Sequence, residues 1–251
     1  MAVEAHMTMS LDGFIAAPDD SVGPLFDWYD AGDVTVPSAD PRWAFHVDAA
    51  SAAFLREVLA ENGALVCGRR LFDVTDGWGG RHPTGVPVFV VTHNVPGEWV
   101  QRHPDAPFTF VTDGVPSAIA KAQAAAGEKV VSVAGGPDLI QQCIRGGLLD
   151  AINISLVPVL LGEGIRLFGD LAAGPLLLAD PAVIQGARAT HLRYQVTQLH
   201  RVRLEEHRHG PGRPIALRSL TAPDRASHSS RYAGPPSARD AVSVVDSGCV
   251  E

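Results

Sequence analysis

Two segments of the sequence place residues that suit an anion directly after an apolar run typical of a β-strand. Gly68, Arg69 and Arg70 follow residues 64–67, and Gly135, Gly136, Pro137 and Asp138 follow residues 130–134. Guanidinium groups stay charged and bind phosphates in a bidentate manner. A helix N-terminus offers free N–H groups to an anion, and glycine lets the backbone come close to it. Both segments therefore suit a phosphorylated ligand.

Each of these signals also has a purely structural explanation. Gly-Gly-Pro is a common turn between a strand and a helix, and Arg69 and Arg70 could simply be solvated on a surface turn. Asp138 counts against a phosphate unless its side chain turns away and serves the helix dipole. The segments match neither G-x-G-x-x-G nor the P-loop. Taken singly, the residues leave the turn and the phosphate site about equally open.

The elements that must position these residues follow a repeating order. Strand-like and helix-like pieces alternate over residues 1–204, with helices expected at residues 48–62, 115–129 and 137–147. Apolar strands between helices predict an α/β fold, with a mostly parallel sheet covered by helices on both faces. The last strands, at residues 150–164 and 191–204, have no clear helix between them and predict an antiparallel C-terminal edge.

A parallel sheet would bring the anion-binding segments to one edge. Ligands of open α/β sheets bind beyond the carboxyl ends of the strands. Thr92 and His93 also follow an apolar strand, residues 86–91, and would lie between the two anion sites. This arrangement suits a dinucleotide with an additional phosphate, which NADPH has and NADH lacks.

Two segments differ in character from the rest. Residues 205–251 are rich in Pro, Ser, Gly and Arg and are expected to form a mostly disordered tail. Residues 19–47 look like a long irregular loop, and long ordered loops are usually functional. Within this loop Asp27, Trp28, Trp43 and His46 are candidates for lining a pocket, although burial under the loop explains the two tryptophans equally well.

The overall composition argues against several classes of function. The net charge of −8 gives no support for a nucleic-acid or anionic-membrane partner. The three cysteines are odd in number and widely spaced, which favours a reducing cytoplasm. The N-terminus lacks signal-peptide features, and no apolar run approaches the roughly 20 residues of a membrane span. The ten histidines form no metal-binding spacing, so no metal is expected.

Five segments occur in the order seen in the dihydrofolate-reductase-like reductases. They are SLDGFIA (10–16), LVCGRRLFD (65–73), VFVVTHN (88–94), VAGGPDLIQQ (133–142) and ISLVPVLLGEGIRLF (154–168). The sequence resembles this family over about residues 5 to 203, and most of all the reductase domain of the bifunctional riboflavin biosynthesis protein. The resemblance implies a dihydrofolate-reductase-like fold, NADPH as hydride donor and a homodimer.

Carried over by position, the resemblance also implies roles for individual residues. The cofactor side comprises Gly68, Arg69, Arg70, Thr92, His93, Gly135, Gly136, Pro137, Asp138 and Leu139. The substrate side comprises Ser10, Leu11, Asp12 and Gly13, with Gly162 and Gly164 at its border and Trp28 as a residue that could stack on a heterocycle. Asp12 is the candidate catalytic residue for orienting substrate or relaying a proton, although Asp-Gly after a strand is also an ordinary turn.

The sequence thus predicts a cytoplasmic, NADPH-dependent reductase of a small heterocyclic or carbonyl compound, formed by residues 1–204. The alternative is a nucleotide-binding protein of the same fold without turnover, in a regulatory or resistance role. Folate reduction is not expected, because no acid aligns with the proton-donating carboxylate of true dihydrofolate reductases. The H-x-E…P-C-x-x-C pattern of a zinc deaminase domain is absent.

Overall fold

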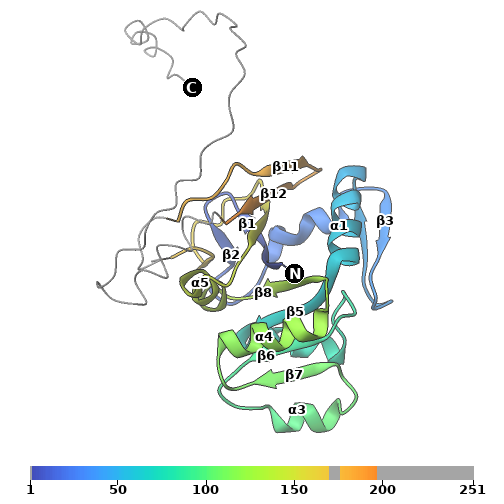
Figure 1. Ribbon diagram of the computed structural model, residues 1–251. Helices are drawn as coiled ribbons and strands as arrows, with labels where there is room; N and C mark the ends of the chain where they lie inside the picture. The colour runs from blue at the N-terminus through green and yellow to red at the C-terminus, as the bar shows by residue number, and fades with distance from the viewer. Residues whose placement is uncertain (1, 170–175, 197–251) are drawn as a thin grey trace, which may run out of the picture. The chain divides into compact units, whose positions relative to one another are not determined.

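The structure, a computed structural model, describes residues 2–169 and 176–196. Within these residues the chain forms an eight-stranded sheet in the order β11-β12-β9-β1-β8-β5-β6-β7 (Figure 1). The strands are β1 (Val3–Ser10), β5 (Asn62–Gly68), β6 (Val88–Val91), β7 (Phe108–Val111), β8 (Val130–Ala134), β9 (Ala151–Val157), β11 (Ala182–Gln185) and β12 (Thr190–Gln195). Strands β9 to β7 pair in parallel, whereas β12 and β11 are antiparallel. The predicted parallel sheet with an antiparallel C-terminal edge is confirmed.

Helices cover both faces of this sheet. They are α1 (Ala49–Glu61), α2 (Arg69–Val74), η2 (Asp76–Gly80), α3 (Gly97–Arg102), α4 (Val115–Ala126) and α5 (Pro137–Gly146). Alternate side chains of β5 point to opposite faces of the sheet. Ala64 and Val66 pack in the hydrophobic cluster beneath α4 and α5. Leu65 and Cys67 instead pack with Phe72 of α2, on the opposite face.

Local capping explains where the predicted helices begin and end. Asp48 accepts hydrogen bonds from the backbone N of Ala50 and Ser51 and so caps α1. Gly127 and Gly147 have positive φ and end α4 and α5. Helix α1 ends at Glu61 with Asn62 as its C-cap, as expected, but Asn62 has an extended backbone at φ −67° and ψ 130° and already begins β5.

Two predictions about other segments are wrong. The strand expected over residues 150–164 ends at Val157, since Pro158 has no N–H for a ladder. Residues 19–47 do not form an irregular loop. They contain the 3-10 helix η1 (Gly23–Asp30) and the hairpin of β3 (Val34–Pro37) and β4 (Ala44–Val47).

The segment of residues 19–47 has its own hydrophobic core against α1. This core contains Leu25, Trp28, Val36, Val47, Ala52, Leu55, Val157 and Ala189. Its elements are short, and Pro24 opens the 3-10 helix, so its apolar residues show neither helical nor strand spacing. The segment is therefore ordered by contacts with distant parts of the chain.

A small antiparallel ribbon joins the turns that follow β1 and β9. It pairs β2 (Phe14–Ala16) with β10 (Ile165–Arg166). Gly164, at φ +140°, lies so close to this ribbon that a Cβ there would be 2.2 Å from the backbone O of Ala16. The tail predicted at residues 205–251 lies outside the described residues. No helix in the described part of the chain is long and apolar enough to cross a membrane.

Candidate active site

A cavity of about 1240 Å³ opens at the carboxyl ends of the parallel strands. All the residues predicted on the cofactor side line it, namely Gly68, Arg69, Arg70, Thr92, His93, Gly135, Gly136, Pro137, Asp138 and Leu139. They come from the ends of β5, β6 and β8, which are neighbours in the sheet. The parallel topology thus brings three segments that are far apart in the sequence to one edge.

The turn between β8 and α5 depends on two glycines for different reasons. Gly135 has φ +125°, and a Cβ there would lie 3.5 Å from the backbone N of Gly68, so the turn after β8 lies close to the end of β5. Gly136 has ordinary φ −61°, but a Cβ there would meet no atom within 4 Å. No side chain caps α5. Its first turn therefore presents backbone N–H groups beside open space, which suits an anion.

Arg69 connects the ends of β5 and β6. Its Nη1 donates to the backbone O of Asn94 at 2.9 Å and lies 3.4 Å from Oγ1 of Thr92. Its Nε donates to Oδ1 of Asp73 at 2.7 Å. The guanidinium is thus held at the cavity edge by groups on both sides.

Arg70 forms an ion pair across the cavity edge with Asp20, which lies between β2 and η1. Its Nε and Nη2 donate to the two carboxylate oxygens at 2.8 and 2.9 Å. The hydrogen bonds and charge of Asp20 raise the pKa of Arg70, and the negative charge of Asp138 acts in the same direction. Asp138 therefore lies within electrostatic reach of Arg70, whose charge it shares with Asp20.

Asp12 organises the turns at the β1 edge. Its carboxylate accepts hydrogen bonds from Oγ of Ser10 at 2.6 Å and from the backbone N of Leu161 and Gly162 at 3.2 and 2.7 Å. The hydrogen bond from Ser10, with the backbone N–H groups, lowers the pKa of Asp12 to about 2. Asp12 thereby fastens the turn after β1 to the turn after β9.

The residues predicted on the substrate side do not all meet at the cavity. Ser10, Leu11, Asp12, Gly13, Gly162 and Gly164 lie together near the β2–β10 ribbon, outside the cavity lining. Trp28 does line the cavity; it is 2% exposed, and its Nε1 donates to Oγ1 of Thr8 at 3.4 Å. Trp43 also lines the cavity and is 51% exposed.

Sequence reasoning missed the inner wall of the cavity, which lies beneath α1. It includes His6, Thr8, Phe54, Leu55, Val58, Asn62, Ser132, Asn153 and Ser155. A signal was available, because Glu4, His6, Thr8 and Ser10 alternate along β1 and so share one face. Polar residues at every second position of a central parallel strand are unusual and indicate a face that is not packed as core.

Other reactive groups near the cavity are less suited to chemistry. Cys67 and Cys143 are buried, and burial raises the pKa of both thiols to about 12. They are therefore protonated and unreactive near neutral pH. Over residues 2–169 and 176–196, no group of three or more His, Cys, Asp or Glu side chains could hold a metal ion.

A comparison with protein families matches the model of the RibD C-terminal domain to residues 2–183. No curated protein is similar enough in sequence to be matched. Among solved structures, the chain is similar to a protein from Shewanella sp. PV-4 that is provisionally named a riboflavin biosynthesis protein. The sequence identity is 24% and the TM-score 0.55, over 78% of this chain and 99% of that one. This likeness shows a shared fold.

Two further solved structures are more distant. One is a pyrimidine reductase-like protein from Corynebacterium diphtheriae, with 17% identity and a TM-score of 0.48 over 78% of this chain and 92% of that one. The other is dihydrofolate reductase from Enterococcus faecalis in complex with NADP(H), with 17% identity and a TM-score of 0.44 over 77% and 95%. Both are too distant to carry a functional argument.

Proposed function

The chain belongs to the RibD C-terminal domain family and has a dihydrofolate-reductase-like fold, and from this premise we propose that it is an NADPH-dependent reductase of a small heterocyclic or carbonyl compound. The observation that carries the proposal is the cavity at the sheet edge. Its rim has anion-binding groups, whereas its interior combines aromatic and apolar side chains with a few polar ones, among them His6, Ser132 and Asn153. A nucleotide and a small organic substrate need this combination in one site.

The rim residues fit a phosphorylated dinucleotide. The open space beside Gly136, at the uncapped start of α5, would hold the pyrophosphate. Arg69 and Arg70 would hold the additional phosphate that distinguishes NADPH from NADH, since both side chains reach the rim and stay charged. Thr92 and His93 do not lie between these sites as expected, because β5 separates β6 from β8 in the sheet. They lie beyond Arg69, on the side away from Gly136, and would border the adenosine.

When bound, NADPH supplies the hydride, and the chain supplies position and a dry surrounding. Apolar and aromatic side chains that line the cavity would shield the bound nicotinamide from water, namely Phe26, Trp28, Tyr29, Phe45, Phe54 and Leu55. The catalytic role of Asp12 stays a prediction. Its three hydrogen bonds favour a positioning role, in which it holds the turn after β9 beside the turn after β1.

The alternative of nucleotide binding without turnover is less well supported. The cavity continues from the rim to a wall lined by His6, Ser132 and Asn153, which a protein that binds only a nucleotide would not need. A homodimer in the cytoplasm, with a small-molecule substrate as the only other partner, belongs to the same proposal and follows from the family resemblance.

Titration of the full chain with NADPH and with NADH tests the proposed function. Tryptophan fluorescence suits the measurement, because Trp28, Trp43 and Trp78 all line the cavity. We expect saturable quenching and a rise in melting temperature with NADPH, and a weaker response with NADH. Equal and negligible responses to both would contradict the proposal.

A further inference from the structure

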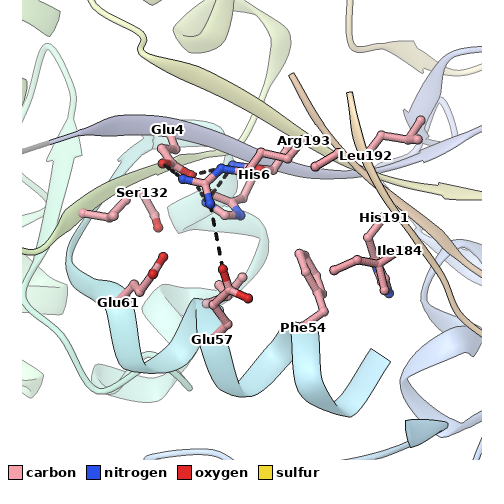
Figure 2. A pocket seen from close by; sticks show the side chains of 14 residues that line it. Glu4, His6, Phe54, Glu57, Glu61, Ser132, Ile184, His191, Leu192 and Arg193 are labelled. Atoms are coloured by element: carbon pink, nitrogen blue, oxygen red, sulfur yellow. Dashed lines mark hydrogen bonds and ion pairs between the residues drawn. The ribbon is translucent and has the colours of Figure 1, made fainter. Parts of the chain in front are cut away.

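A second, smaller cavity meets the main one beneath α1. Its volume is about 250 Å³, and it lies between α1 and strands β1, β8, β9 and β12 (Figure 2). His6, Phe54, Val58, Ser132 and Asn153 line both cavities. The space that opens at the rim therefore extends beneath α1 to a polar inner end, away from Arg69 and Arg70.

Asn62 has a buried side-chain oxygen without a hydrogen-bond partner in this region. It is 3% exposed, it lines the main cavity where α1 ends and β5 begins, and its Oδ1 is buried without a hydrogen-bond partner. A buried amide without a partner is costly, and such a group calls for an explanation. The carboxamide can offer a ligand an acceptor at Oδ1 and a donor at Nδ2.

Two carboxylates of α1 make the inner end electrically negative. Glu57 and Glu61 reach from α1 toward the strands, with Glu61 directed at Ser132 (Figure 2). Arg193 is the fixed positive charge among the lining residues, and its Nη2 donates to Oε1 of Glu4 at 2.6 Å. Nη1 of Arg193 also lies 3.9 Å from Oε1 of the exposed Glu57, and its Nε is buried without a hydrogen-bond partner. The three carboxylates of Glu4, Glu57 and Glu61 outweigh this single guanidinium, so the potential at the inner end is negative.

Glu4 keeps its negative charge in this surrounding. Burial raises the pKa of Glu4, but hydrogen bonds from His6 and Asn153, together with the charge of Arg193, outweigh that effect and bring the pKa to about 2. His6 lies 3.6 Å from Glu4 and 3.2 Å from the amide N of Asn153. His191, the other histidine of the lining, is held neutral near pH 7, because burial lowers its pKa to about 4.

We propose that the inner end of the cavity, formed by Asn62, Ser132, His6 and Asn153 and bordered by Glu57 and Glu61, receives an uncharged or cationic hydrogen-bonding group of the substrate and rejects an anionic one. This inference rests on the proposed function, in which the rim holds the cofactor. The two ends of the cavity then differ in charge preference. An anionic cofactor binds at the rim, and a substrate that carries an amide, amine or amidine is favoured over a carboxylate or phosphate at the inner end.

Three probes of almost identical shape test the charge preference without any variant. They are benzamidine, benzamide and benzoate, which are cationic, neutral and anionic near neutral pH. We expect protein-observed NMR titration of the full chain to show shifts at the inner-end residues with benzamidine and benzamide, and affinity for benzoate lower by about tenfold or more. Benzoate that binds there as tightly as benzamide would overturn the inference.

Two variants test the roles of Asn62 and Glu61 in binding these probes. Asn62→Leu, which keeps the branched shape of the side chain but removes the amide, is expected to weaken the binding of benzamide by about tenfold. Gln101→Leu also replaces an amide side chain by leucine, at an exposed position of α3, and is expected to leave the binding of all three probes unchanged. Glu61→Gln is expected to narrow the gap between benzoate and benzamide. Unchanged probe affinities in both Asn62→Leu and Glu61→Gln would contradict the proposed site.

Titration with NADPH separates this inference from the proposed function. If wild-type protein binds no NADPH, the proposed function fails, and the inference fails with it as a statement about a reductase substrate. If NADPH binds but benzoate competes as well as benzamide at the inner end, the inference alone fails. Melting temperatures of Asn62→Leu and Gln101→Leu show whether either exchange has changed the fold.

Discussion

Asp20 and Arg70 form a two-pronged ion pair that joins the segment before η1 to the first turn of α2. The distances are 2.8 Å from Nε to Oδ1 and 2.9 Å from Nη2 to Oδ2, between residues 50 positions apart in the sequence. Both residues line the cavity. A phosphate that binds Arg70 must therefore share this guanidinium with Asp20 or displace the carboxylate.

Removal of the competing carboxylate should strengthen cofactor binding. Exposed ion pairs contribute only about 0–1 kcal/mol, so we expect Asp20→Ala to tighten NADPH binding by about two- to fivefold and to leave NADH unchanged. Isothermal titration calorimetry measures both. Asp113→Ala is the matched control, since it breaks the exposed pair with Lys121 on α4. Weaker NADPH binding in Asp20→Ala would mean that the ion pair holds Arg70 in its binding position.

The two arginines should discriminate between the cofactors. Hydrogen bonds to charged groups contribute roughly 1.5–3 kcal/mol. Arg69→Ala and Arg70→Ala are therefore each expected to lower the affinity for NADPH by about tenfold or more. NADH, which lacks the extra phosphate, should lose less than about threefold. Arg145→Ala, an exposed arginine in the last turn of α5, is the control. Equal losses for the two cofactors would show that the arginines do not contact the extra phosphate.

His191 should make the stability of the fold depend on pH. It is buried between the hydroxyls of Ser155 and Ser51, at 2.9 and 3.1 Å from its ring nitrogens. Burial lowers the pKa of His191 from 6.5 to about 4, and the charge of Asp48 only partly opposes this. The folded chain thus binds fewer protons than the unfolded chain between about pH 6.5 and 4, so the free energy of unfolding falls as the pH falls through this window.

Substitution of His191 should flatten that dependence. Each unit of pKa shift corresponds to about 1.4 kcal/mol, so the contribution of His191 is on the order of 3 kcal/mol. In urea unfolding, His191→Gln is expected to have a lower free energy of unfolding than wild type at pH 7. Between pH 7 and pH 4 it is expected to lose less of that free energy than wild type does. His82, whose pKa burial also lowers to about 4, keeps part of the effect. His46→Gln, at an exposed position, is the control; identical pH slopes in wild type and His191→Gln would contradict the account.

The sheet and its main helices could be predicted from the sequence because their signals are local. The β-branched residues of β8 are recognisable within a few residues of chain, as are helices α4 and α5, which have Pro in the first turn and Gly at the end. The order of the elements then placed Gly68, Thr92 and Gly135 on one edge. The rim of the cavity followed from that order, since the ends of parallel strands share one edge.

The inner wall and the β1 edge could not be predicted, because they depend on contacts between distant residues. Asp12 obtains two of its partners from Leu161 and Gly162, and nothing near Asp12 in the sequence indicates them. Trp28 is buried in a core formed with α1, so its position could not be told from that of a surface loop residue. His6 and Thr8 of β1 line the cavity beneath α1, a helix far from them in the sequence.

The affinity of Gly136→Ala for NADPH tests the central claim most directly. Alanine readily adopts the φ −61° and ψ 160° of Gly136, and its Cβ would meet no protein atom within 4 Å, so the fold should be unchanged. Gly97→Ala is the matched control, since a Cβ there also meets nothing. We predict that wild type and Gly97→Ala bind NADPH equally and that Gly136→Ala, with an unchanged melting temperature, binds at least about tenfold more weakly, since the added methyl group would occupy the space of the pyrophosphate. Equal NADPH affinity in all three proteins, or no binding by wild type, would contradict the account.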